Sequence, residues 1–252
     1  MISAKLAALA VAGLAAATAG SCRGGDSSDA HPSPPAASRP SASAPSTSAT
    51  AANAPPAPAG DPAPARESDS RAVILFVGTS LTAGLGLDPS EAYPALVQQK
   101  LDAAGLRYRV VNAGVSGETS AGALRRVSWL LRQPVAVLVL ETGANDGLRG
   151  QDPDATRANI QAFFDTARQA RPQPRLVLAA MEALPNYGEP YRRRFRAIYP
   201  ELAKANRATL VPFLLEGVAG DPALNQPDGI HPTAEGQAKV ADTVWKALEP
   251  LL

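Results

Sequence analysis

The apolar positions between residues 71 and 252 fall into five short runs, each followed by a stretch with helical spacing. Apolar and β-branched runs of this length are typical of strands buried on both faces of a parallel sheet. Strands are predicted over 72–78, 107–114, 135–143, 175–181 and 208–213. Helices are predicted over 91–105, 119–132, 153–170, 190–206 and 233–252, the fourth broken at Pro200. This alternation predicts a three-layer α/β/α sandwich around a five-stranded parallel sheet.

The first 70 residues differ from this pattern. Residues 1–21 contain one lysine, an alanine-rich apolar run and then small residues, which is typical of a secretory signal peptide. The run is shorter and less apolar than a spanning helix requires, so we expect export rather than retention as a membrane anchor. Residues 22–70 are rich in Ala, Pro and Ser and predict a disordered tether before a domain at 71–252.

Cys22 is the only cysteine of the chain and follows Ala19, Gly20 and Ser21. The stretch resembles a bacterial lipobox, although leucine is usual where Ala19 stands, and the pattern favours lipidation of Cys22. The alternative is ordinary cleavage after Ala17-Thr18-Ala19, with Cys22 incidental. A chain with one cysteine forms no intramolecular disulfide, and membrane contact is expected only through the lipid.

The composition excludes one class of partner. The net charge is +1, with 24 Lys and Arg against 23 Asp and Glu. Proteins that bind nucleic acid generally carry a basic stripe or patch, so no nucleic-acid partner is expected.

Polar residues that can carry chemistry follow four of the five predicted strands. Ser80 comes after the first strand, Gly117 after the second and Asn145 after the third, while Asp228 and His231 come late in the loop after the fifth. Because the carboxyl ends of parallel strands meet at one edge of the sheet, we expect these residues to lie close together.

Each of these residues also has an ordinary explanation. Ser80 fits a turn, and no lysine follows at the spacing of a phosphate-binding loop. Taken singly, His231 fits an exposed position, Asp228 and Gly117 fit turns, and Asn145 fits a helix cap. Together they supply a nucleophile, a base with an orienting carboxylate, and two donors for an oxyanion. Their combination therefore favours a serine hydrolase.

Four sequence blocks carry a resemblance to a known family. The blocks "GTSLTAG", "NAGVSGETS", "GANDGLRG" and "DGIHPT" are similar to those of the SGNH (GDSL-like) hydrolases, in particular the exported acyl thioesterase, arylesterase and lysophospholipase subgroup. The resemblance extends over about residues 72–252. It implies a flavodoxin-like SGNH hydrolase fold, a catalytic triad of Ser80, His231 and Asp228, and an oxyanion hole formed by Ser80, Gly117 and Asn145.

The chain departs from this family at Thr79, because the first block normally reads Gly-Asp-Ser-Leu. If the usual aspartate only supports the turn, the threonine hydroxyl can replace it. If the aspartate tunes the charge of the site, activity falls. We expect activity to survive.

The resemblance also implies the type of substrate. In the subgroup, the loop after the asparagine helps to form an apolar groove, and Leu148 is the expected wall here, unless it is simply an exposed leucine. Aryl, lysophospholipid-like or thioester substrates are expected, without a metal or cofactor. Two alternatives stay open: a carbohydrate O-deacetylase that uses the same residues, and a catalytically dead ligand-binding lipoprotein. The sequence does not indicate an oligomeric state.

Overall fold

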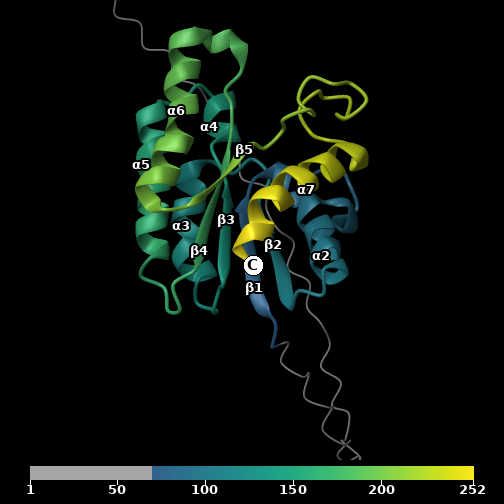
Figure 1. Ribbon diagram of the computed structural model, residues 1–252. Coiled ribbons are helices and arrows are strands. Elements are labelled where there is room, and N and C mark those ends of the chain that lie inside the picture. Colours follow the sequence, from purple (N-terminus) through teal and green to yellow (C-terminus); the bar gives the residue numbers. More distant parts are fainter. Residues whose placement is uncertain (1–69) are drawn as a thin grey trace, which may run out of the picture. The chain divides into compact units, whose positions relative to one another are not determined.

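The computed structural model describes residues 70–252 (Figure 1). The predicted signal peptide, the predicted tether up to residue 69 and Cys22 lie outside the described residues and stay predictions. None of the described helices is long and apolar enough to cross a membrane.

Five parallel strands form one sheet in the order β2-β1-β3-β4-β5. The central strands β1, β3 and β4 are almost wholly buried because their runs of Val, Leu and Ile face helices on both sides. The strands are β1 (Ala72–Gly78), β2 (Tyr108–Gly114), β3 (Val137–Glu141), β4 (Arg175–Ala180) and β5 (Thr209–Phe213). All five lie within the predicted ranges, and the longest disagreement is at β3, which starts and ends two residues inside its range.

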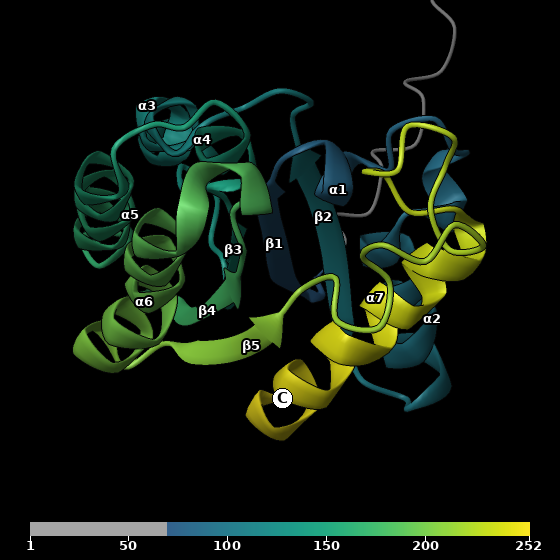
Figure 2. The same cartoon turned by 90° about the horizontal axis from the view of Figure 1, so that it is seen from above.

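Helices cover both faces of the sheet, as the alternating pattern predicts. Figure 2 shows α3, α5 and α6 on one face, and α2 and α7 on the other. The long helices are α2 (Tyr93–Ala103), α3 (Ser120–Leu130), α5 (Pro153–Ala167), α6 (Gly188–Asn206) and α7 (Ala234–Leu248). The predicted three-layer α/β/α fold is therefore confirmed.

Two short α-helices were not predicted, α1 (Ser80–Ala83) and α4 (Ala144–Leu148). Each follows a central strand directly, and each is too short to show a helical repeat of apolar residues. Three single turns of 3-10 helix complete the described part of the chain: η1 (Pro89–Glu91), η2 (Pro185–Tyr187) and η3 (Glu249–Leu251).

The predicted break at Pro200 is wrong, because α6 continues through it. A proline inside a helix removes one backbone hydrogen bond and costs about 3 kcal/mol. Pro200 lies on the exposed side of α6, where water can reach the carbonyl group that loses its partner. Phe195 and Tyr199 before it and Leu202 after it are buried against the core. Burying each of these side chains stabilises the helix by about 2 kcal/mol or more, which offsets the cost.

Candidate active site

Ser80 lies at the sharp turn between β1 and α1, at the carboxyl edge of the sheet. It is the first residue of α1, and the preceding Thr79 caps this helix with its side chain, which accepts a hydrogen bond from the backbone N–H of Leu81. Only 9% of Ser80 is exposed. The turn therefore presents a largely buried serine at a capped helix start.

A continuous line of hydrogen bonds connects Ser80, His231 and Asp228. The Oγ atom of Ser80 lies 2.8 Å from Nε2 of His231. The other ring nitrogen of His231, Nδ1, lies 2.6 Å from Oδ2 of Asp228. A histidine held in this way can accept the proton of a serine hydroxyl while the carboxylate stabilises the charged ring.

The second carboxylate oxygen of Asp228 is also occupied. Oδ1 accepts hydrogen bonds from the backbone N–H groups of Ile230, at 2.9 Å, and His231, at 3.0 Å. The hydrogen bonds to Asp228 hold the pKa of its carboxyl group well below the ordinary value. The bond from the backbone N–H of His231 contributes most, and the bond with its ring contributes next. Asp228 is therefore ionised across the pH range in which a histidine acts as a base.

The loop that carries Asp228 and His231 is closed by backbone contacts. The N–H of Gln226 donates to the carbonyl of His231 at 2.7 Å, and the N–H of Thr233 donates to the carbonyl of Leu224 at 2.9 Å. Thr233 also caps α7, which begins at the next residue. His231 is therefore held in place by these loop contacts and by the start of α7, which follows it closely in the sequence.

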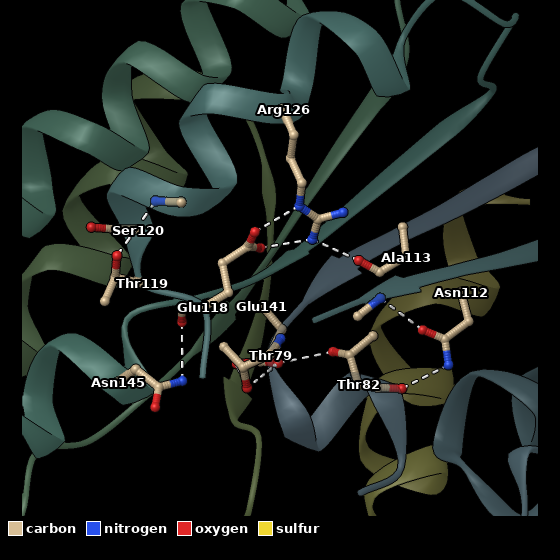
Figure 3. Close-up of polar contacts among 12 residues, drawn as sticks. Thr79, Thr82, Asn112, Ala113, Glu118, Thr119, Ser120, Arg126, Glu141 and Asn145 are labelled. Carbon is tan, nitrogen blue, oxygen red and sulfur yellow. Dashed lines mark hydrogen bonds and ion pairs between the residues drawn. The ribbon is translucent and has the colours of Figure 1, made fainter. Parts of the chain in front are cut away.

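Gly117 and Asn145 lie beside Ser80, on the loop after β2 and in α4. Gly117 has φ +77°, a left-handed conformation that glycine adopts without strain. The side-chain amide of Asn145 donates one N–H to the backbone carbonyl of Glu118 at 3.0 Å, as Figure 3 shows. An amide has two N–H groups, so this bond uses half of its donors.

The start of α4, which positions Asn145, depends on Gly143. This residue has φ +98°, and a Cβ atom there would lie 2.3 Å from the hydroxyl of Tyr199. That hydroxyl donates to the carbonyl of Thr142 at 3.0 Å. Glycine therefore lets α6 approach the turn that carries Asn145.

A buried carboxylate next to Asn145 was not predicted. Asp146 is fully buried and accepts hydrogen bonds from the backbone N–H of Ser120, at 2.9 Å, and from its hydroxyl, at 2.5 Å. It joins α4 to the first residue of α3. One feature of the sequence could have pointed to Asp146. It directly follows Asn145 at the end of an apolar strand.

The second unpredicted carboxylate explains Thr79. Glu141 is fully buried at the end of β3 and receives the backbone N–H of Thr79 at 2.7 Å. The hydroxyls of Thr79 and Thr82 donate to the same carboxylate oxygen, each at 2.9 Å, as Figure 3 shows. Burial raises the pKa of Glu141, and these hydrogen bonds oppose that effect. The hydroxyl of Thr79 thus supports the turn geometry and gives the carboxylate a donor.

We expect Thr79→Val to lower the free energy of unfolding by about 2 kcal/mol, because Glu141 loses a donor and the N–H of Leu81 loses its acceptor. Thr79→Ser keeps the hydroxyl and is expected to lose less than about 1 kcal/mol. Urea denaturation of the two variants and the parent measures this difference. Equal stability of the valine variant and the parent would show that the hydroxyl is not needed.

A cavity of about 620 Å³ opens beside these residues. Ser80, Gly117, Asn145 and His231 lie at its wall, and Leu148 lies there as well. Most of the remaining lining is apolar and comes from the ends of β4 and β5 and the loops that follow: Met181, Ala183, Leu184, Pro185, Phe213, Leu215 and Ile230. The structure therefore brings together all the site residues predicted between residues 71 and 252.

The wall of the cavity around Leu148 is held by two tyrosines. The hydroxyl of Tyr187 donates to the carbonyl of Leu148 at 2.8 Å, and that of Tyr191 donates to the carbonyl of Gln151 at 2.7 Å.

Among residues 70–252, no group of three or more His, Cys, Asp and Glu side chains is placed to hold a metal ion.

Comparisons with known proteins give the family. The model of the GDSL-like lipase/acylhydrolase family matches residues 76–239. The chain belongs to this family. It is 42% identical over 180 residues to the esterase TesA of Pseudomonas aeruginosa, a match that covers 71% of this chain and 89% of TesA. It is 41% identical over 181 residues to the thioesterase 1/protease 1/lysophospholipase L1 of Escherichia coli, covering 71% and 84% of the two chains.

Solved structures agree with this assignment. The psychrotrophic esterase EstA from Pseudoalteromonas sp., in a structure inhibited by monoethylphosphonate, is 32% identical. It matches with a TM-score of 0.67 over 71% of this chain and 97% of its own. The recognised SGNH resemblance is therefore confirmed, and this member of the GDSL-like family is a serine ester hydrolase.

Proposed function

We propose that this family member hydrolyses carboxylic esters with Ser80 as nucleophile, His231 as general base and Asp228 as the residue that orients it. The unbroken hydrogen-bond line from Asp228 through His231 to Ser80, ending at an apolar cavity, carries the proposal. Its two heavy-atom distances, 2.6 and 2.8 Å, are within the range for proton transfer.

In the first half of the reaction, Nε2 of His231 takes the proton of Ser80 as Oγ forms a bond to the carbonyl carbon. The carbonyl oxygen becomes an oxyanion. The backbone N–H groups of Ser80 and Gly117 and the second amide N–H of Asn145 stabilise it. The C–O bond to the leaving group then breaks, and His231 passes its proton to the departing oxygen.

Water completes the cycle. His231 accepts a proton from a water molecule as the oxygen of this water attacks the carbonyl carbon of the acyl-enzyme. The same three donors stabilise the second oxyanion. The bond to Oγ breaks, and His231 returns the proton to Ser80. Both steps begin from a neutral His231 that carries its proton on Nδ1. The ionised carboxylate of Asp228 favours this tautomer and stabilises the ring once it is charged.

The cavity indicates esters with an apolar acyl or aryl group. Its walls beyond the triad are made mainly of Met, Leu, Phe, Pro and Ile side chains. We propose medium-chain acyl, aryl or lysophospholipid-like esters, in agreement with relatives named as a thioesterase and lysophospholipase and as an esterase. An O-deacetylase for carbohydrates is less well supported, because a sugar ester would leave this apolar wall unused.

Hydrolysis of p-nitrophenyl esters from acetate to palmitate tests the proposal. We expect kcat/KM to rise from acetate to a medium-chain optimum. Leu148→Trp fills the cavity wall and is expected to lower kcat/KM for the decanoate about 10-fold, which corresponds to the loss of one or two buried methylene groups. Acetate is the internal control and should change less than about 2-fold. An acetate-only profile in the parent would instead favour the deacetylase.

The proposal includes export of the enzyme and lipidation of Cys22. Both rest on the composition of residues 1–22, which lie outside the described residues, and both stay predictions.

A further inference from the structure

Glu118 and Arg126 form an ion pair next to the proposed oxyanion hole. The guanidinium group of Arg126 donates from Nε to Oε1 and from Nη2 to Oε2 of Glu118, each at 2.7 Å. Nη2 also donates to the backbone carbonyl of Ala113 at 2.6 Å. Figure 3 shows Arg126 between these two partners. Only 9% of the Glu118 side chain and 21% of the Arg126 side chain are exposed.

The pair connects three elements at one point. Arg126 belongs to α3, Ala113 to β2, and Glu118 to the loop between them. Two parallel hydrogen bonds from a planar guanidinium fix the direction of a carboxylate as well as its distance. The side chain of Glu118 is therefore held against the helix and the strand, and the backbone of the loop is held with it.

This loop supplies one proposed oxyanion donor, the backbone N–H of Gly117, and contacts a second, Asn145. Glu118 directly follows Gly117, and its own carbonyl accepts the amide of Asn145 at 3.0 Å. The carbonyl of Glu118 thereby fixes one N–H of Asn145 and, because the amide is planar, the direction of the other. A rotation of the peptide after Glu118 would turn the free N–H away from the cavity.

We propose that Arg126 is a positioning residue of the oxyanion hole, which acts through Glu118 on the amide of Asn145. The inference rests on the proposed function, in which Asn145 stabilises the oxyanion. A donor misplaced by about 1 Å can cost on the order of 100-fold in rate. The pair therefore affects kcat and leaves the apolar wall that binds the acyl group unchanged.

A purely structural role predicts a different result. A largely buried ion pair that loses one partner lowers the stability of the fold. Lower stability reduces the amount of active enzyme but does not change kcat per active site. Counting the sites by complete reaction with a p-nitrophenyl phosphonate separates the two effects.

Arg126→Lys tests the inference, because lysine keeps the positive charge and loses the two parallel hydrogen bonds. We expect kcat per site for p-nitrophenyl butyrate to fall about 10- to 100-fold, with KM within about 2-fold of the parent. Arg125→Lys is the matched control, since Arg125 precedes Arg126 on α3 and is exposed. This control should leave both constants unchanged. An unchanged kcat per site in Arg126→Lys would overturn the inference.

A double-mutant cycle with Asn145→Ala shows whether the effect passes through the amide. Asn145→Ala alone is expected to lower kcat about 100- to 1000-fold. In that background Arg126→Lys should lower kcat by less than about 3-fold, because the group that it positions is absent. Full multiplication of the two effects would overturn the inference and leave the proposed function intact.

The remaining outcomes are equally decisive. An unchanged kcat in Asn145→Ala would refute both the oxyanion role of Asn145 and the inference that depends on it. If Arg126→Lys yields too little folded protein, Glu118→Gln breaks the same pair from the other side, and the same cycle applies with the same expected result.

Discussion

Replacing Ser80 with alanine is expected to lower kcat for p-nitrophenyl butyrate by at least about 10⁴-fold. The hydroxyl of Ser80 lies 2.8 Å from Nε2 of His231, and the structure places it at the wall of the apolar cavity. Without it, no acyl-enzyme forms. Only the oxyanion donors and substrate binding remain, which leaves a weak hydrolysis by water.

The fold should tolerate this change, because alanine removes only the hydroxyl of Ser80 and its hydrogen bond with His231. Wild-type enzyme should gain one phosphonyl group from a p-nitrophenyl phosphonate, and Ser80→Ala should gain none. Ser128→Ala, at an exposed position on α3, is the control and should behave like the parent. Retained hydrolysis or labelling in Ser80→Ala, with melting temperature unchanged, would rule out Ser80 as the nucleophile and would also reopen the question of what the cavity binds.

The sequence predicted the central strands well because nearly all of their residues are apolar. "AVILFVG" and "VLVLE" contain no polar residue before the end of the strand, which is typical of strands that are buried on both faces. The same runs place Ser80 and Asn145 at the carboxyl edge. The loop with Asp228 and His231 was recognised because the two residues occur together in one short segment.

Contacts that depend on strand register could not be predicted. Val77 pairs with Leu140, and this register places Glu141 beside the turn at Thr79, 62 residues away in the chain. A glutamate at the end of an apolar strand gives no sign of its partner. The Glu118–Arg126 pair could not be predicted either, because it depends on how α3 is placed relative to the loop before it.

Asp228 holds His231 through two oxygens with different partners. Oδ1 faces two backbone N–H groups, and Oδ2 faces Nδ1 of the ring. An asparagine at this position must turn its oxygen toward the two backbone donors, since its NH₂ group would otherwise face them. The NH₂ group then faces Nδ1, which can only accept a hydrogen bond from it. The proton of the ring therefore moves to Nε2, the atom that accepts the proton of Ser80 in the proposed mechanism.

We expect Asp228→Asn to lower kcat about 10⁴-fold, through the wrong tautomer as well as the lost charge. Asp228→Ala removes the charge but imposes no tautomer, so it should be no less active than Asp228→Asn. Asp221→Asn in the same loop is the control, because Asp221 is exposed and its side chain accepts the backbone N–H of Ala223, away from His231. Nitrogen NMR can report the tautomer directly, since the chain has only two histidines. A proton that stays on Nδ1 in Asp228→Asn, or an Asp228→Asn enzyme with near-parent kcat, would show that Asp228 does not set the state of the base.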